Sequence, residues 1–184
     1  AALTAAVILG GITRIGAVAE KLVPAMCVLY IVCVLWVLGV FFDRIPAAFE
    51  LIITQAFAPT AAVGGFAGST MLMAMRMGVA RGIFSNEAGL GTAGIAQAAG
   101  QSTSPVFSGL VGMMGTFIDT IIVCTMTGLA IVVSGVWNSG ASGALLSTQG
   151  FEAAMPGVGK YVLALSLAVF AFTTILGWAY YGEK

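Results

Sequence analysis

The chain has 184 residues, of which 60% are hydrophobic and 8% are charged, with a formal net charge of +0. Soluble domains carry roughly 25% charged residues. This composition and a mean hydropathy of +1.08 therefore indicate an integral membrane protein embedded in the lipid bilayer. The balanced charge gives no reason to expect a nucleic-acid partner. The sequence contains no His, which removes the commonest proton relay, metal ligand and catalytic base.

The chain opens on AALTAAVILGG, which resembles the last turns of a helix more than a protein start, so we interpret the sequence as a fragment. A polar connection through Gly10, Gly11 and Arg14 is expected next. Residues 22–40 then form an apolar run about long enough to cross ~30 Å of hydrocarbon. Pro24 is expected in the first turn of that helix, where its missing N–H does no harm.

Residues 45–75, IPAAFELIITQAFAPTAAVGGFAGSTMLMAM, predict a helix that is broken in the middle of the membrane. Its ends are apolar, whereas Pro59, Gly64 and Gly65 fall near the centre, where a continuous helix accommodates them least well. A membrane helix can break there only if its freed backbone groups meet protein, water or a ligand. Such helices point to the substrate and ion sites of secondary transporters. A simple kink is the alternative, because Pro and Gly are common in membrane helices.

The joint of this broken helix is the candidate substrate site. Gly64 and Gly65 would allow the backbone to approach a ligand closely. Thr60 and Phe66 flank the joint and would either contact the ligand or pack between helices. Trp178, in the last apolar run, would either close the pocket or anchor the helix at the headgroups.

Residues 82–104 are too polar and too rich in Gly to span, so they are expected to lie on the cytoplasmic surface with short helices. Within them, Glu87 is expected to pair with Arg76 or Arg81 as part of a gate. Three candidate N-caps end the segment: Ser102, Thr103 and Ser104. Pro105 would then take the first helical position of a span that covers residues 106–134.

Asp119 is the one carboxylate that the pattern places near mid-membrane, some 13 residues into that span. A charge at this depth costs about 2.5–3.5 kcal/mol on insertion scales, so we expect it to have a functional partner. A structural clamp to a neighbouring helix is the alternative. Thr120, Thr125 and Thr127 share its helix, and most such hydroxyls bond back to their own backbone.

Residues 135–159 form a long loop rich in Gly and Ser, whose Leu and aromatic content favours a folded external cap. Residues 161–181 make the last span, which ends in an aromatic cluster typical of an interface.

The basic residues predict the orientation. With the connection at Arg14 cytoplasmic, five basic residues lie inside and two lie outside, in accord with the positive-inside rule. The inside set is Arg14, Lys21, Arg76, Arg81 and Lys184, and the outside set is Arg44 and Lys160. Pairing of Arg44 with Asp43 is expected to weaken the outside charge further.

Three blocks resemble signature blocks of the sodium:alanine/glycine symporters. They are RGIFSNEAGLGTAGIAQAA (residues 81–99), FIDTIIVCTMTGL (117–129) and FAFTTILGWAYYGEK (170–184). The likeness covers nearly the whole chain and is specific, because the blocks occur in the right order. It implies part of a LeuT-like inverted-repeat transporter domain, from the end of the fourth helix through the eighth, with the broken helix as the sixth. The remaining helices of the full-length transporter would lie outside the chain.

The resemblance implies sodium-coupled symport of small neutral amino acids, alanine or glycine, by alternating access across the plasma membrane of a bacterium or archaeon. It implies no enzymatic activity and no cofactor, with sodium as a co-transported ligand. In related sodium carriers the eighth helix supplies a hydroxyl pair for sodium, and this role carries over onto Thr173 and Thr174. Hard cations prefer such oxygen ligands. Asp119 is the third candidate sodium ligand.

Two other classes of function remain as alternatives. A passive channel would use the same broken helix to line a pore. An intramembrane serine protease would use Ser142 in the sequence GASG, but it needs a base for the serine proton, usually a His, which this sequence lacks.

Overall fold

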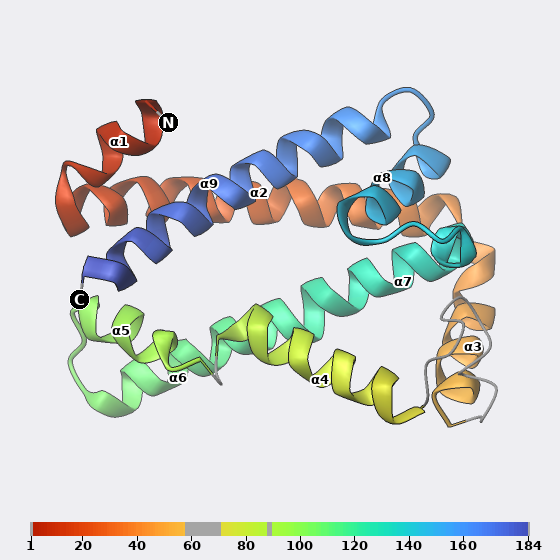
Figure 1. The fold of residues 1–184 in the computed structure, drawn as a ribbon, viewed down its shortest axis with the longest axis horizontal. Coiled ribbons are helices and arrows are strands. Elements are labelled where there is room, and N and C mark those ends of the chain that lie inside the picture. Colours follow the sequence, from red (N-terminus) through yellow and green to blue (C-terminus); the bar gives the residue numbers. More distant parts are fainter. Residues whose placement is uncertain (1, 58–70, 88–89, 184) are drawn as a thin grey trace.

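The structure, a computed structural model, describes residues 2–57, 71–87 and 90–183. These residues form helices joined by short connections, with no strand among them (Figure 1). In chain order the helices are α1 (Ala2–Ile8), α2 (Gly11–Val40), η1 (Phe42–Arg44), α3 (Ile45–Phe57), α4 (Met71–Asn86), α5 (Thr92–Ala99), α6 (Pro105–Thr116), η3 (Phe117–Cys124), α7 (Thr125–Ser134), η4 (Val136–Asn138), α8 (Gly143–Ala154) and α9 (Gly159–Glu183). Here η1 and η4 are 3-10 helices and η3 is a π-helix. The prediction of an all-α protein is confirmed for this part of the chain.

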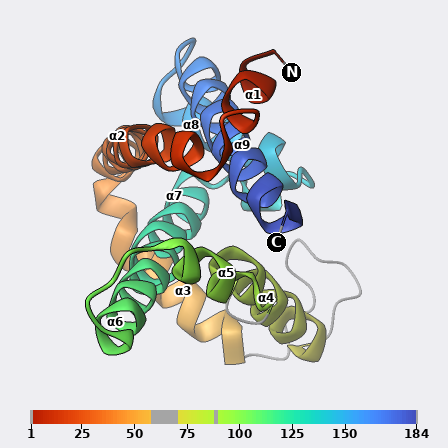
Figure 2. The same ribbon diagram turned by 90° about the vertical axis from the view of Figure 1, so that its left-hand side faces the viewer.

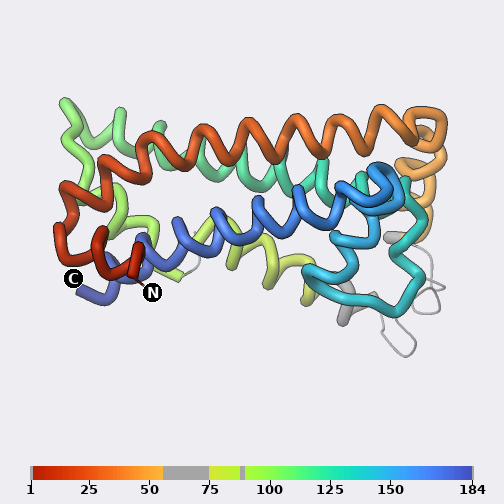
Figure 3. Tube along the Cα trace, turned by 90° about the horizontal axis from the view of Figure 1, so that it is seen from above, coloured from red at the N-terminus to blue at the C-terminus, as the bar shows by residue number. Residues whose placement is uncertain are grey.

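Within these ranges, three helices are long and apolar enough to cross a membrane: Gly11–Val40, Pro105–Ser134 and Gly159–Glu183. The second is one continuous rod made of α6, η3 and α7. All three run along the long axis of the molecule (Figures 1 and 3). Many of their large apolar side chains are exposed, among them Trp36 and Ile121. A surface of this kind suits contact with lipid or with further helices.

The start of α2 differs from the sequence-based expectation. The helix begins at Gly11, so Arg14 lies in its first turns and Pro24 lies inside it rather than in the first turn of a shorter span. The expectation was wrong because the apolar run marks the part of the helix that suits lipid, whereas the helix itself continues through the polar residues before it. Pro24 leaves one carbonyl of the preceding turn without a helical N–H partner.

The main hydrophobic core lies where α2 meets α7, α8 and α9. Its buried residues are Tyr30, Val34, Val37, Ala130, Phe151, Ala154 and Leu163. A second cluster joins α2 to α9 at the other end of their contact, where Ile15 packs with Leu176 and Tyr180. The end view in Figure 2 shows α2, α8 and α9 as one layer and α4, α5 and α6 as the other, with α7 between them.

Helix α3 turns away from the axis of α2 after η1 and lies across one end of the molecule (Figures 1 and 3). Its Ala48 packs against Leu129 and Val133 of α7. Arg44 donates to the Val133 carbonyl at 3.4 Å, and its guanidinium lies 5.0 Å from the centre of the Phe41 ring. Among the described residues no ion pair joins it to Asp43, so the expected pairing is wrong: the arginine caps the end of α7 instead.

Helices α3 and α4 carry the two flanks of the predicted broken segment. The joint between them, with Thr60, Gly64, Gly65 and Phe66, lies outside the described residues. The predicted surface segment at 82–104 begins within α4 and contains the short helix α5.

The predicted start of the second long rod is confirmed. Ser104 is the N-cap of α6, and its hydroxyl accepts the backbone N–H of Phe107 at 3.2 Å. Pro105 takes the first helical position, where its missing N–H costs nothing.

The segment between α7 and α9, residues 135–159, is folded. Helix α8 packs on both neighbours and buries Phe151. The Glu152 carboxylate ties the end of α8 to the start of α9 by accepting the backbone N–H groups of Gly157 at 2.6 Å and Lys160 at 3.0 Å. These bonds, chiefly the one from Gly157, hold the pKa of Glu152 below its ordinary value of 4.5.

Acid is expected to loosen this junction. Because the pKa of Glu152 is lower in the folded protein, its carboxylate contributes stability above the ordinary value of 4.5, and this contribution is lost as the pH falls through the lowered pKa. Hydrogen exchange at Gly157 and Lys160, measured from pH ~7 to pH ~3, checks this. The wild-type protein is expected to lose protection of these two amides in acid. Glu152→Gln, which cannot titrate, should not show this loss, whereas the control Glu50→Gln should show it. Parallel behaviour of wild type and Glu152→Gln would contradict it.

Candidate functional site

Asp119 lies on the π-helix η3, in the middle of the second long rod. The hydroxyl of Ser85, near the end of α4, donates to its Oδ2 at 2.5 Å. One residue further along each helix, the amide of Asn86 donates to the hydroxyl of Thr120 at 3.3 Å. The Ser85 oxygen also lies 3.7 Å from the sulfur of Cys124. Two neighbouring polar contacts therefore join α4 to the π-helix, and π-helical segments occur frequently at functional sites.

A cavity of about 500 Å³ opens beside Asp119. Its walls come from α4, α5, α6, η3 and α9, so segments far apart in sequence converge on it. The lining residues are Ser85, Asn86, Glu87, Ala93, Ala96, Gln97, Val111, Gly112, Met113, Gly115, Thr116, Asp119 and Tyr181. This described lining includes two carboxylates and several neutral polar groups but no Lys or Arg. Its electrostatics therefore suit a cation.

Glu87 is the second carboxylate that lines the cavity. Its backbone has φ +57°, a left-handed conformation that is uncommon for a residue with a side chain. Its carboxylate accepts the Thr92 hydroxyl at 2.8 Å and a hydrogen bond from the Tyr181 hydroxyl of α9. Within the described ranges no ion pair joins it to Arg76 or Arg81, so the expected gate pair is not formed in this structure. Helix α4 runs on to Asn86 and carries both arginines on its exposed surface, whereas Glu87 turns toward α5 and α9.

Thr173 and Thr174 lie midway along α9. Both hydroxyls donate to the carbonyl of Phe170 at 2.9 Å. Thr173 faces α2, where its oxygen lies 3.7 Å from the sulfur of Met26, and Thr174 is exposed. A hydroxyl has one proton and two acceptor lone pairs, so each oxygen keeps acceptor capacity after this bond is made.

The structure does not gather the predicted sodium ligands into one group. Among the described residues, no hydrogen bond links Asp119 to Thr173 or Thr174, and no cluster of three or more His, Cys, Asp or Glu side chains could hold a metal ion. A cation at the threonines would therefore need hydroxyl and carbonyl oxygens rather than several carboxylates.

Of the predicted substrate-site residues, only Trp178 is described. Its ring is 44% exposed and meets Tyr181 edge-on, with the ring centroids 5.9 Å apart. Tyr181 lines the cavity beside Asp119, so the aromatic pair places Trp178 near one wall of that cavity. Thr60, Gly64, Gly65 and Phe66 lie outside the described residues.

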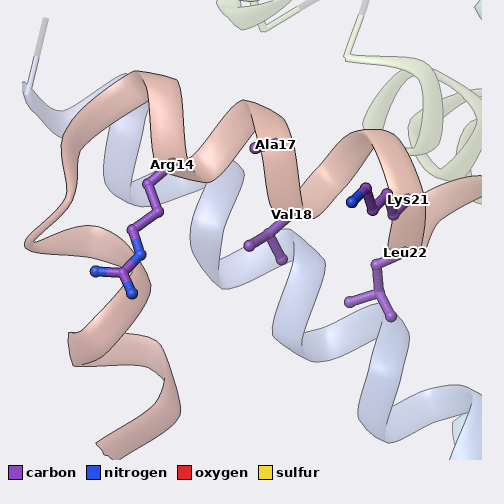
Figure 4. A pocket seen from close by; sticks show the side chains of 5 residues that line it. All are labelled: Arg14, Ala17, Val18, Lys21 and Leu22. Carbon is purple, nitrogen blue, oxygen red and sulfur yellow. The ribbon is translucent and has the colours of Figure 1, made fainter.

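An open groove of about 490 Å³ follows one face of α2. Figure 4 shows Arg14 extending over α1, while Val18 and Leu22 point toward α9. All the residues that line this groove belong to α2, so it lacks the converging groups that hold a small ligand. It is a surface feature of the helix rather than a candidate binding site.

The serine of the GASG sequence lies at the start of α8, where its side chain makes no capping hydrogen bond. Ser142 is exposed and occupies the N-cap position of α8, in extended backbone conformation. It lies in a surface connection rather than at a buried helix end. None of the 184 residues is a His that could take its proton, and an exposed surface serine does not support the protease alternative.

Ser85 at the site and Tyr30 behind the π-helix rod had no sequence signal that singled them out. Ser85 reaches Asp119 across 34 positions, and Tyr30 of α2 reaches Thr127 of α7 across 97, at 2.7 Å. Such partners are set by packing between helices. One hint would have favoured Ser85: it is a polar residue near the end of a helix, and an intramembrane carboxylate needs a polar partner.

The geometry defines a class: an all-α membrane protein in which polar side chains from several helices meet beside a cavity. The family model for the Sodium:alanine symporter family matches residues 1–184. An uncharacterized transporter of Haemophilus influenzae is 48% identical over 180 residues, covering 97% of this chain and 40% of its own length. The sodium/alanine symporter AgcS of Methanococcus maripaludis is 45% identical over 185 residues, covering 98% of this chain and 40% of its own length.

A more distant relative is the probable sodium/glutamine symporter GlnT of Bacillus subtilis. It is 35% identical over 178 residues, covering 96% of this chain and 36% of its own length. The chain thus spans about two-fifths of the length of the curated relatives it matches. It belongs to the sodium:alanine symporter family, whose proteins are transporters rather than enzymes.

Proposed function

We propose that this chain is part of a sodium-coupled symporter. The symporter carries small neutral amino acids, alanine or glycine, across the plasma membrane by alternating access. Family membership over residues 1–184 carries the proposal, together with 45% identity to a protein named a sodium/alanine symporter. A LeuT-like inverted repeat is part of the proposal, and its remaining helices lie outside this chain. The co-transported ion is the ligand that the protein requires, and no cofactor takes part.

The cavity beside Asp119 supports a cation-coupled carrier. Its carboxylates, Glu87 and Asp119, face a space with no Lys or Arg in the described lining. A cleft of one charge sign raises the local concentration of counter-ions. Sodium, or the ammonium group of an amino acid, is the chemistry that such a cleft favours.

Sodium is proposed to bind Thr173 and Thr174, with backbone oxygens from helices outside this chain completing the shell. Both hydroxyls can donate to the Phe170 carbonyl at 2.9 Å, and each oxygen then keeps lone pairs that could face a cation. Asp119 would act at a second cation position on the path, or would hold the broken helix through Ser85.

The amino acid is proposed to bind at the joint of the broken helix, against Thr60, Gly64, Gly65 and Phe66, with Trp178 as a further wall. The bulk of Phe66 and Trp178 would restrict the pocket to small side chains. Binding of sodium and amino acid together favours closure if the occluded state makes contacts that the open states lack.

Gly65→Leu tests the joint. The substitution is expected to abolish amino-acid binding, because a side chain there would occupy the space that the ligand needs. Binding of labelled alanine to purified protein measures this, with membrane yield as a check on folding. Gly16→Leu, on an exposed face of α2 with nothing within 4 Å of an added Cβ, is the matched control and should bind normally. Normal binding by Gly65→Leu would reduce the joint to a kink.

Counterflow separates a carrier from a channel. Proteoliposomes loaded with unlabelled alanine and diluted into a trace of labelled alanine should accumulate the label transiently above its outside concentration. A carrier exchanges one substrate for another through the same site, whereas a passive pore lets the label equilibrate only. Simple equilibration would favour the channel over the symporter.

A further inference from the structure

We propose that Tyr30 is a positioning residue for Asp119. Tyr30 acts on the π-helix η3 by way of Thr127 of α7. The inference rests on the proposed role of Asp119 in cation-coupled transport. Tyr30 lies on α2 and contacts neither the cavity nor Asp119 directly. Its effect would pass through one short chain of hydrogen bonds.

The direction of that chain follows from its geometry. The Thr127 hydroxyl donates its proton to the carbonyl of Val123, inside the π-helix, at 2.7 Å. Because a hydroxyl has a single proton, the Tyr30 hydroxyl is the donor in the 2.7 Å contact between Tyr30 and Thr127. The chain therefore runs from α2, through Thr127, to a backbone carbonyl of η3.

Tyr30 is held firmly enough to serve as an anchor. Its side chain is only 9% exposed and belongs to the main core. The ring stacks on Phe151 of α8 with centroids 6.2 Å apart, and it meets Phe170 of α9 edge-on at 5.6 Å. Side chains of three other helices, Thr127 of α7, Phe151 of α8 and Phe170 of α9, thus hold the Tyr30 side chain.

The π-helix controls which side chains face Ser85. Asp119 and Cys124 are five residues apart, and both contact the Ser85 oxygen. In an α-helix, which turns about 100° per residue, residues five apart point about 140° away from each other. The i→i+5 hydrogen bonds of a π-helix instead bring residues five apart onto the same face. The shared contact with Ser85 therefore depends on the π register.

A π register is rare and needs support from its surroundings. The Thr127 hydroxyl bonds to the Val123 carbonyl near the carboxyl end of η3, and the Tyr30 hydroxyl bonds to Thr127, so Tyr30 is linked to the backbone of η3 through one side chain. Without the Tyr30 hydroxyl, η3 should shift toward the α register. Asp119 and Cys124 would then no longer face Ser85 together.

The first test reads the register without measuring transport. In full-length protein with Cys124 as the only native cysteine, Ser85→Cys places a second thiol beside it, and mild oxidation should join the two. Adding Tyr30→Phe, which keeps the ring packing, should slow this cross-linking about fivefold, as expected for one lost hydrogen bond. Thr127→Val should do the same, and Thr127→Ser, which keeps the hydroxyl, should not. Tyr180→Phe, at another buried tyrosine, is the matched control.

The second test measures sodium dependence of labelled alanine uptake with Ser85 intact. Tyr30→Phe and Thr127→Val should raise the half-saturating sodium concentration about fivefold, with Thr127→Ser and Tyr180→Phe near wild type. The proposal is overturned if the two thiols of the Ser85→Cys protein fail to cross-link, or if adding Tyr30→Phe leaves the cross-linking rate unchanged. It is also overturned if Tyr180→Phe slows cross-linking as much as Tyr30→Phe does. A Tyr30→Phe variant that cross-links more slowly but keeps wild-type sodium dependence would overturn it as well. Absence of sodium-dependent uptake in wild type would refute the proposed function, and cross-linking would still decide the register.

Discussion

Replacing Asp119 with Asn is expected to abolish sodium-coupled uptake or to reduce it at least about tenfold, which corresponds to ~1.4 kcal/mol. The substitution keeps the size of the side chain and one carbonyl oxygen, which can still accept the Ser85 hydroxyl. It removes the negative charge and replaces the second oxygen by an amide NH2 group. That charge lies in a membrane-spanning helix, where a carboxylate without a function is costly, and it faces a cavity that suits cations.

The comparison with Ser85→Ala makes the test specific. This second variant removes the donor at 2.5 Å but leaves the carboxylate. If the charge acts on a cation, Asp119→Asn should be the more damaging of the two across a range of sodium concentrations and pH. If Asp119 is only a clamp between helices, Ser85→Ala should be at least as damaging. Wild-type rates and wild-type sodium dependence in Asp119→Asn would refute the functional role.

The double substitution of Thr173 and Thr174 by Val is expected to weaken apparent sodium affinity at least about tenfold, or ~1.4 kcal/mol. Val keeps the branched shape but removes both oxygens. The lost bonds to the Phe170 carbonyl are local to α9, so protein yield should fall much less than sodium affinity. Uptake of labelled alanine at a series of sodium concentrations measures the effect.

Thr148→Val is the control for this pair. Thr148 of α8 makes the same kind of bond to its own helix, to the Ala144 carbonyl at 2.8 Å, but lies in the segment between α7 and α9. Its loss should leave sodium dependence unchanged. If the double variant of Thr173 and Thr174 keeps the same sodium dependence as Thr148→Val, these two threonines of α9 do not bind sodium.

The sequence predicted the second and last long helices well because each depends on a local pattern. Apolar runs of membrane length and the Ser104–Pro105 start signal placed the second rod within a residue of its observed bounds. Pro24 was misplaced because hydropathy measures contact with lipid, whereas α2 continues through Arg14 and Lys21.

The site was predictable only in part. Asp119 stood out because a charge in an apolar run is costly, and this can be recognised without knowing its neighbours. Its partner Ser85, the anchor Tyr30 and the actual contacts of Glu87 depend on packing between helices, which no local pattern encodes. The π register is equally hidden, because residues 117–124 read as an ordinary apolar helix.

Uptake of labelled alanine by the full-length protein in proteoliposomes tests the central claim most directly. With sodium outside and none inside, alanine should accumulate above its external concentration, because the ion gradient drives the coupled substrate. With equal sodium on both sides, or with potassium in its place, the label should reach equilibrium at most. Equal accumulation with and without the sodium gradient, or no uptake of alanine or glycine in either condition, would contradict sodium-coupled symport.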